Sequence, residues 1–365
     1  MLKVLQVIEG LNAGGAETLL INLHRNIDRN QIQFDYIITN PSPNQDYMEE
    51  IKSLGGRIYV LPSFNGFNYL EIINCWNTFF KNHKDYLILH SHIRSYASLY
   101  LPIAKRYGLY TIVHSHSTSN GTGIKAALKG LLQFPLRYEA DYYLSCSDKA
   151  GTWLFGNNII EKKNYSILKN AIDTRKFAYN SSNRMRMRDL LSLNGCYTYI
   201  HVGRFHESKN HVFLINLFKL IHDSYPDTKL LLLGDGELFP EIQDLIVKEK
   251  LLDSVILVGS VENTYDYLQA ADCFLFPSLW EGLGMSVIEA QASGLHCICS
   301  TNVPEEVDIT GLCEFVPLES NYEWFCRACN RHTDRFDTSR SIIDSGYDIR
   351  ETTLALTKIY YSIVS

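Results

Sequence analysis

The feature that most constrains the fold is an alternation of short apolar runs with helical patterns, which occurs twice along the 365 residues. An apolar run of strand length at residues 3–8 leads through a glycine-bearing turn to leucines at helical spacing in residues 16–27. Further strand-like runs follow, mostly separated by helical patterns, at residues 34–39, 57–61, 86–90, 110–114 and 141–146. This alternation predicts a parallel sheet covered by helices on both faces.

The same pattern begins again after Asn170. The second series of predicted strands comprises residues 199–202, 229–233, 254–258, 273–277 and 297–300. The chain exceeds the size at which one hydrophobic core keeps growing, and the polar stretch 179–184 is the predicted linker. We therefore expect an α/β protein of two doubly wound, Rossmann-like domains facing a central cleft, formed by residues 1–178 and 179–347. A C-terminal helix at 348–365 is expected to cross back to the first domain.

Composition excludes several classes of protein. Hydrophobic residues make up 46% and charged residues 20% of the chain, a globular balance, and the net charge of −6 argues against a nucleic-acid binder. No window reaches the roughly 20 apolar residues of a membrane span, and the N-terminus lacks the layout of a cleavable signal. A cytoplasmic location is expected. The nine cysteines are scattered, and the one CxxC, Cys326 to Cys329, has only His332 near it, so we expect core residues rather than a metal site.

Two glutamates lie around a predicted strand, loop and helix. Glu281 falls in the loop after residues 273–277, and Glu289 falls within a helix predicted at 285–292 and closed by Gly294. Ligands of open parallel sheets bind beyond the carboxyl ends of the strands. Carboxylates accept hydrogen bonds from sugar hydroxyls, and backbone N–H groups at a helix N-terminus suit a diphosphate. The residues expected to supply these N–H groups are Gly282, Leu283, Gly284 and Met285. The alternative is that Glu281 is solvated and Glu289 only favours the helix dipole.

Two cations follow the strand predicted at 199–202. Arg204 offers a planar fork and Lys209 a point charge, and together these groups commonly grip a diphosphate. Taken alone, they would be ordinary surface charges. Their place between a strand and a helix favours the binding role.

Glycine-bearing loops follow two other predicted strands. Gly14 and Gly15 supply backbone that can approach a phosphate, although the spacing is not that of the dinucleotide fingerprint, and a plain turn before a helix is the alternative. Gly234 begins a Gly-Asp-Gly-Glu turn, whose acidic residues Asp235 and Glu237 could be mistaken for metal ligands. The flanking glycines indicate a tight turn instead, because two carboxylates at a diphosphate would repel it without a cation.

Histidines follow two strands of the first domain. They form the pairs His90 and His92, and His114 and His116. A zinc site is the alternative to a substrate-binding role, but no cysteine or carboxylate completes it at the usual spacing. We expect no bound metal and no cofactor.

The segment 123–137 combines basic and apolar residues at roughly helical spacing. It could lie on an anionic membrane surface, or its apolar stripe could pack into the core.

The chain resembles the retaining GT-B glycosyltransferases of family four over nearly its whole length. The motif that carries the resemblance is a glutamate followed after seven residues by a second glutamate, matched here by Glu281 and Glu289. The resemblance implies that Glu281 contacts the donor sugar and Glu289 the ribose. It also implies that Arg204 and Lys209 bind the diphosphate, and that the donor phosphates lie near Gly14, Gly15 and Gly234. The catalytic histidine of the family falls on His116, with His114 as the rival.

The predicted function is retaining transfer of a hexosyl unit from a nucleotide diphosphate sugar, UDP-linked, to a glycan hydroxyl. Similarity to capsular and exopolysaccharide enzymes implies a lipid-linked acceptor on the inner face of the cytoplasmic membrane, with peripheral membrane contact. No carboxylate nucleophile for a double displacement is evident. The alternatives are a nucleotide-sugar epimerase of the same fold and an inactive binding subunit of a transferase complex.

Overall fold

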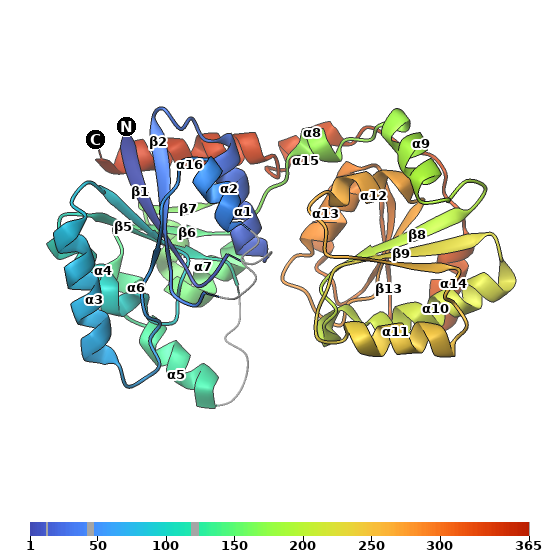
Figure 1. Cartoon of the computed structure of the whole chain (residues 1–365), viewed down its shortest axis with the longest axis horizontal. Helices are drawn as coiled ribbons and strands as arrows, with labels where there is room; N and C mark the ends of the chain where they lie inside the picture. The colour runs from blue at the N-terminus through green and yellow to red at the C-terminus, as the bar shows by residue number, and fades with distance from the viewer. Residues whose placement is uncertain (12–13, 42–46, 118–123, 365) are drawn as a thin grey trace. The chain divides into compact units, whose positions relative to one another are not determined.

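The computed structural model describes residues 1–11, 14–41, 47–117 and 124–364, with side chains from residue 129 onward in the last range. The chain forms two compact units (Figure 1). The N-terminal unit comprises Met1–Ile172 and Gly346–Ser365, and the C-terminal unit comprises Asp173–Ser345. Each unit is a parallel sheet with helices on both faces.

The N-terminal unit contains a seven-stranded sheet in the order β3-β2-β1-β4-β5-β6-β7. Its strands are β1 (Leu2–Ile8), β2 (Ile32–Ile38), β3 (Ile58–Val60), β4 (Ile88–Ser91), β5 (Tyr110–Ser115), β6 (Tyr142–Ser145) and β7 (Tyr165–Ile167). Its helices are α1 (Gly15–Asn26), α2 (Met48–Ser53), α3 (Tyr69–Asn82), α4 (Ala97–Arg106), α5 (Ile124–Gln133), α6 (Leu136–Glu139), α7 (Asp148–Phe155), the 3₁₀ turn η1 (Asn157–Glu161) and α16 (Ile349–Val364).

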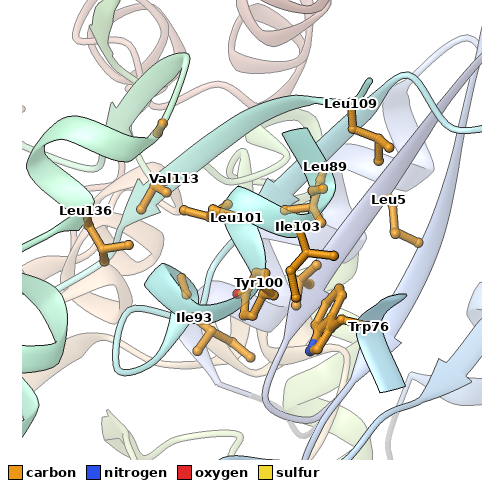
Figure 2. Packing of buried hydrophobic residues seen from close by; sticks show 14 of the residues in the cluster. Leu5, Trp76, Leu89, Ile93, Tyr100, Leu101, Ile103, Leu109, Val113 and Leu136 are labelled. Atoms are coloured by element: carbon orange, nitrogen blue, oxygen red, sulfur yellow. The ribbon is translucent and has the colours of Figure 1, made fainter. Parts of the chain in front are cut away.

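Strand β1 explains why this sheet is covered on both faces. Successive side chains of a strand point to opposite faces, and here both sets are buried. Leu5 joins the core beneath α3 and α4, whereas Val4 joins the core that includes α1 and α16. In the first core, the rings of Trp76 and Tyr100 stack with centroids 4.2 Å apart; Figure 2 labels both residues and Leu5 within this core. Near-continuous burial of this kind is typical of a parallel sheet between two helical layers.

The C-terminal unit contains a six-stranded sheet in the order β10-β9-β8-β11-β12-β13. Its strands are β8 (Tyr197–Val202), β9 (Thr228–Leu233), β10 (Val255–Gly259), β11 (Cys273–Phe276), β12 (His296–Ser300) and β13 (Cys313–Val316). Its helices are α8 (Thr174–Phe177), α9 (Ser181–Leu190), α10 (His211–Ser224), α11 (Phe239–Lys248), α12 (Thr264–Ala270), α13 (Met285–Ala292), α14 (Asn321–Cys329), α15 (Ser339–Asp344) and the 3₁₀ turns η2 (Glu207–Lys209) and η3 (Glu305–Val307).

The polar stretch predicted as a linker is largely helical. Asn180 caps the N-terminus of α9, because its side chain accepts a hydrogen bond from Asn183 N–H. Arg184 then pairs with Asp272 and fastens the helix to the C-terminal unit. The polar cluster is therefore an N-cap signal, and the chain passes between the units after Ile172 rather than after residue 178.

The final helix packs within the N-terminal unit. Leu356 and Tyr360 of α16 belong to the same buried cluster as α1. The returning chain is also tied to the outgoing chain, since Ile349 N–H donates to the Ile172 carbonyl at 2.9 Å. Within the described ranges, every helix falls short of the length or the apolar character that a membrane-spanning helix requires.

The strand order places a topological switch point in each sheet. Each predicted strand overlaps an observed one, and β7 and β13 are additional edge strands. The order reverses between β1 and β4 in one unit and between β8 and β11 in the other. Loops after such strands form the crevice in which open α/β sheets bind ligands, so candidate site residues are expected after these four strands.

Candidate active site

In the C-terminal unit the loops after β8 and β11 bring Lys209 and Glu281 together. The loops are joined by a hydrogen bond from Leu279 N–H to the Ser208 carbonyl, at 2.8 Å. Lys209 Nζ lies 2.5 Å from Glu281 Oε1, and the two side chains are only 17% and 12% exposed. Because both charges are largely removed from water, each depends on the other for compensation.

The backbone around Lys209 explains why its side chain reaches this position. Asn210 adopts the left-handed conformation at φ 55°, which asparagine tolerates, and so joins η2 to α10. A Cβ on Gly203 would lie 3.1 Å from Lys209 Cδ, so glycine leaves room for the lysine stem. The ammonium group also lies 4.7 Å from the centre of the Phe276 ring. This cation–π contact adds to the ion pair in fixing the charge.

Arg204 lies on the same loop but faces another carboxylate. Its side chain is 71% exposed, and its guanidinium lies 3.2 Å from Glu237 Oε2. Glu237 therefore balances Arg204, and the side chain of Asp235 accepts a hydrogen bond from the following N–H. The exposed pair leaves Arg204 able to change partner at little cost, because surface ion pairs contribute little.

Gly234 is required where the loop after β9 packs on the loop after β8. Its φ is 131°, and a Cβ there would lie 2.1 Å from the Gly203 carbonyl oxygen. Its own N–H already donates to the Gly259 carbonyl at 2.8 Å. Any contribution of Gly234 to ligand binding would therefore come from the space that the missing side chain leaves.

Helix α13 begins directly after the Glu281 loop. Gly284 is the N-cap residue at φ 93°, and no described side chain caps this end of the helix. Gly282 is exposed, and Leu283 and Met285 are half-buried. The first backbone N–H groups of a helix have no partner within it, so this uncapped terminus presents donors beside Glu281.

Glu289 lies one turn further into α13. Burial raises the pKa of its carboxyl group from 4.5 to about 7. Among the described residues its side chain has no hydrogen-bond or ion-pair partner, and it is five positions into the helix, beyond the first-turn amides. Glu289 is half-buried, and a partly desolvated carboxylate without a donor from the protein favours a ligand that supplies hydroxyl donors.

In the N-terminal unit the loop after β1 carries Gly14 and Gly15. Gly14 is the N-cap residue of α1, and Gly15 is exposed. A Cβ on Gly14 would lie 2.3 Å from Glu17 Oε2, so the absent side chain lets Glu17 fold back over the loop. Burial raises the pKa of Glu17. Because the Glu17 carboxylate is the end of a flexible side chain and Gly14 has an extended conformation at φ −101°, the structure does not itself require glycine at this position.

His92 and His116, after β4 and β5, form a hydrogen-bonded pair. His92 Nδ1 lies 2.8 Å from His116 Nε2, and His92 Nε2 lies 3.0 Å from Gln6 Oε1. Gln6 Nε2 donates to the Tyr360 hydroxyl at 3.0 Å, and that hydroxyl lies 2.8 Å from His90 Nδ1. One chain of hydrogen bonds therefore joins β1, β4, α16 and the loop after β5.

With the Gln6 amide oriented as it is, the direction of this chain of hydrogen bonds sets the tautomers of His92 and His116. Gln6 presents its oxygen to His92, so His92 Nε2 carries the proton and His92 Nδ1 accepts. His116 Nε2 must then be the donor, which leaves His116 Nδ1 as an unprotonated acceptor. That nitrogen is buried, and the nearby side chain of Asn170 partly offsets the lowering of the His116 pKa by burial.

The histidines are neutral near pH 7. Burial, with Arg94 nearby, lowers the pKa of His116 to about 3, and burial lowers the pKa of His90 to about 3. The pKa values of His92 and His114 lie well below 6.5, for the same reason. His114 lies within β5 and is fully buried, whereas His116 lies beyond the strand and is partly exposed.

Sequence patterns did not indicate the residues that support the histidine cluster of the N-terminal unit or the Lys209–Glu281 pair of the C-terminal unit. Gln6 and Tyr360 are 354 positions apart, and Tyr360 is one aromatic residue within an apolar helical stripe. Phe276 could not be singled out from the sequence either, because it is one of several buried apolar residues in its strand. A polar residue inside a continuous apolar strand, as Gln6 is, was the one available signal.

The segment 123–137 forms α5 and the start of α6, and Figure 1 shows α5 away from the sheet of its unit. The large apolar side chains of Leu131, Phe134 and Tyr138 are 72%, 52% and 74% exposed. Arg137 lies over the Phe134 ring, 5.1 Å from its centre. Leu136, by contrast, is fully buried in the core of the N-terminal unit, so the described part of the segment has both core and exposed apolar side chains.

The chain matches two models of glycosyltransferase families. Residues 13–176 match the family model described as Glycosyltransferase Family 4, and residues 187–311 match that of Glycosyl transferases group 1. The chain belongs to this family and is a glycosyltransferase with the GT-B fold.

Individual relatives span different lengths of the chain. The putative glycosyltransferase EpsF of Bacillus subtilis is 33% identical over 98% of this chain and 96% of its own. The UDP-Gal:alpha-D-GlcNAc-diphosphoundecaprenol alpha-1,3-galactosyltransferase of Escherichia coli is 31% identical over 39% of this chain and 38% of its own. The structure of HepE from Anabaena with UDP and glucose superposes with a TM-score of 0.78, at 15% identity, covering 99% of this chain and 100% of HepE.

Proposed function

We propose that this glycosyltransferase transfers a hexosyl unit, with retention of configuration, from a UDP-sugar to a hydroxyl of a lipid-linked glycan in surface polysaccharide synthesis. The observation that carries the proposal is the site on the C-terminal unit. There, the Lys209–Glu281 pair adjoins the uncapped start of α13 and the unpartnered Glu289. The name of the E. coli relative and the UDP bound by HepE support the donor and acceptor classes.

The donor's parts would be divided among these groups. Lys209, Arg204 and the backbone from Gly282 to Met285 would bind the diphosphate, because they supply positive charge and N–H donors. Glu281 would accept hydrogen bonds from the sugar. Glu289 would accept hydrogen bonds from the ribose hydroxyls, which supply the donors that this carboxylate lacks in the protein.

The reaction needs charge stabilisation on one side of the reacting carbon. The acceptor oxygen bonds to the anomeric carbon on the face from which UDP departs, the bond to the β-phosphate oxygen breaks, and the acceptor proton passes to that oxygen. Lys209, Arg204 and the α13 N-terminus would stabilise the charge that develops on the diphosphate. Preorganised groups of this kind are usually the largest contribution to such a step. We propose that no metal takes part.

The N-terminal unit would bind the acceptor and the sugar. His116, rather than His114, is the proposed catalytic histidine, because its ring lies beyond the end of β5 and is partly exposed, whereas His114 is fully buried. Gly14 and Gly15 would let the loop after β1 approach the donor phosphates. A protonated His116 is not required.

Membrane contact is proposed for the end of α5 and for α6. The exposed Leu131, Phe134 and Tyr138 adjoin Arg137. A hollow of about 150 Å³ lies beside them, lined in part by Phe134, Arg137 and Trp153. Exposed apolar and basic side chains on one surface suit the interface of an anionic membrane, where a lipid-linked acceptor would be held. The proposed location is therefore the cytoplasmic face of that membrane.

The decisive experiment has two stages. A panel of nucleotide sugars is screened by thermal unfolding, since a ligand that binds the native state raises the midpoint. The stabilising UDP-sugar is then incubated with a polyprenyl-diphosphate-linked acceptor, and the anomeric configuration of the product is determined by NMR. Interconversion of sugars without acceptor would favour an epimerase and contradict the proposal.

Two variants separate the roles of the glutamates. Glu289→Ala should weaken binding of bare UDP, whereas Glu281→Ala should leave it unchanged and abolish transfer. If Glu281→Ala supported glycan synthesis as well as the unaltered chain, the protein would be a binding subunit instead. Equal loss of UDP affinity in both variants would contradict the division of roles.

A further inference from the structure

A second cluster of chemically reactive side chains in the C-terminal unit lies near edge strand β13, away from the strand ends that carry the candidate active site. His296 is the first residue of β12, Glu314 lies on the edge strand β13, and His332 follows α14. In register, His296 is level with the start of β11, whereas Glu281 follows the end of β11. The cluster is thus separated from the donor loops by the length of the strands.

The ligand atoms of this cluster converge. His296 Nε2 lies 2.8 Å from Glu314 Oε1, and His332 Nε2 lies 3.8 Å from the same oxygen. One ligand atom from each of the three residues lies within 4.8 Å of the others. Ligand atoms bound to Zn²⁺ at about 2.0–2.2 Å in a tetrahedron lie roughly 3.3–3.6 Å apart, a value between the two measured separations.

The residues around the cluster hold its members in place. Arg327 lies 2.9 Å from the second oxygen of Glu314, which turns the first oxygen toward the histidines. The His332 carbonyl accepts a hydrogen bond from the Tyr197 hydroxyl at 3.1 Å. Arg331 makes two 2.9 Å hydrogen bonds to Asp227. Ligands that are oriented by such outer contacts need little reorganisation to bind a metal.

Access and charge also favour an ion. The side chains of His296, Glu314 and His332 are 11%, 26% and 41% exposed, so an ion can enter from solvent. The buried histidines of the N-terminal unit present another group of converging ligands, His90, His92 and His114. There, no carboxylate belongs to the group to offset the charge of a metal ion. At the proposed site, His332 Nε2 also lies 3.2 Å from Asn330 Nδ2, an exposed contact that a metal ion would replace.

We propose that His296, Glu314 and His332 bind one divalent transition-metal ion of the Zn²⁺ class. Two imidazole nitrogens and one carboxylate oxygen are the ligand types preferred by Zn²⁺, Ni²⁺ and Co²⁺, and they disfavour Mg²⁺ and Ca²⁺. Three protein ligands leave a fourth position for water. The ion links edge strand β13 to the segment between α14 and α15 and stabilises the C-terminal unit. This proposal is independent of the sugar-transfer proposal.

The test uses the full chain after treatment with a chelator. ZnCl₂ is titrated by calorimetry, and thermal unfolding is followed with and without the metal. We expect one equivalent to bind and the unfolding midpoint to rise by several degrees at saturation, since metal binds the native state. MgCl₂ at the same concentration should produce neither effect.

Variants locate the ion. His332→Ala removes an exposed ligand, and Glu314→Gln keeps the shape of its side chain, so each should lower Zn²⁺ affinity at least about tenfold. His83→Gln, in the N-terminal unit, is the matched control and should bind Zn²⁺ like the unaltered chain. UDP binding by His332→Ala should be unchanged, which shows that the variant is folded.

Two results would overturn the metal site. One is the absence of saturable Zn²⁺ binding by the unaltered chain. The other is one equivalent bound equally well by His332→Ala and Glu314→Gln, which would place the ion elsewhere, for example at the histidines of the N-terminal unit. Loss of sugar transfer with intact Zn²⁺ binding would concern only the proposed function.

Discussion

The two units place chemically different groups at equivalent topological positions. Both sheets reverse strand order next to the first strand of the unit, at β1/β4 and at β8/β11. The C-terminal switch point holds a charged pair, Lys209 and Glu281, whereas the N-terminal one holds the neutral pair His92 and His116. Equivalent topology therefore fixes where a site lies, and the local residues decide whether it carries charge.

Burial explains why the two switch points differ. Each charge of the Lys209–Glu281 pair is compensated by the other, so both remain at a mostly buried position. No carboxylate belongs to the chain of hydrogen bonds that contains His92 and His116, so burial keeps both imidazoles neutral. A charged site suits a diphosphate, and a neutral acceptor suits a hydroxyl, which is the division of labour that the proposed function assigns to the two units.

The largest expected effect comes from removing the cation of the charged site. In Lys209→Ala, transfer should fall about 10³-fold in kcat, because one preorganised group that stabilises developing charge is worth about that factor. Bare UDP should also bind more weakly. Steady-state kinetics with the UDP-sugar measures the first effect and calorimetry the second.

Lys219→Ala is the matched control, since Lys219 lies on α10 and pairs only with Asp223 among the described acidic residues. It should retain full activity. If Lys209→Ala kept more than half of the activity, the charged site would not serve the reaction, and the contrast between the two units would have no catalytic meaning.

The neutral histidine pair, His92 and His116, should affect kcat more than it affects the Kd for UDP. His116→Ala should lower kcat about 10²-fold, because a misplaced sugar loses about that factor when a group that positions it is removed, and should leave the Kd for UDP unchanged. His83→Gln in the same unit is the control. A parallel loss of UDP affinity in His116→Ala would instead place His116 in nucleotide binding.

The third prediction uses the pH dependence of Glu289, whose pKa of about 7 in the free protein arises from burial. Hydroxyl donors favour the ionised form, so UDP should bind more tightly as pH rises. The ionised fraction is about one tenth at pH 6 and about nine tenths at pH 8 for this pKa, so the Kd should fall roughly ninefold. Glu289→Gln, titrated with UDP under the same conditions, should lose this dependence and also corrects for the ionisation of UDP itself.

The stability of the free protein should also depend on the ionisation of Glu289. It should fall as pH rises, whereas UDP affinity should increase. A raised folded-state pKa stabilises the protein at pH below about 4.5, and that contribution is lost as pH rises through about 7. The unfolding midpoint of the free protein should therefore decline over this window relative to that of Glu289→Gln. Identical pH profiles for the two proteins would show that Glu289 is already solvated or paired.

Sequence periodicity predicted most of the fold because the central strands are buried on both faces and read as continuous apolar runs. The two edge strands were missed for the converse reason. β7 has three residues and β13 has four, and most of their side chains are only partly buried. The linker was misplaced because the helix cap at Asn180 has the same polar composition as a loop.

The candidate site was predictable to the extent that its residues follow strands. Lys209 and Glu281 could be placed on neighbouring loops, although their ion pair could not be derived without the structure. The chain from Tyr360 through Gln6 to His92 was out of reach, because it joins residues hundreds of positions apart through side-chain orientation. Burial of Glu289 depends on packing around α13 and could not be derived from spacing.

The smallest expected effect tests whether the hydrogen-bonded chain positions His116. In Gln6→Met, His92 loses the acceptor at Nε2, so His116 no longer has a single preferred tautomer. One neutral hydrogen bond is worth about 1 kcal/mol, so kcat should fall about fivefold. Imidazole ¹⁵N chemical shifts should show His116 protonated at Nε2 in the unaltered chain and a mixture of tautomers in the variant.

Gln6→Glu provides the rescue. Its carboxylate keeps an acceptor for His92 but cannot donate to Tyr360. If the tautomer of His116 controls the rate, Gln6→Glu should restore kcat and the ¹⁵N signature while stability stays below that of the unaltered chain. Equal losses of kcat in both variants, in proportion to the decrease in their unfolding midpoints, would contradict the positioning role. Gln6 would then contribute only to packing, and its hydrogen bond to His92 would not influence the reaction at His116.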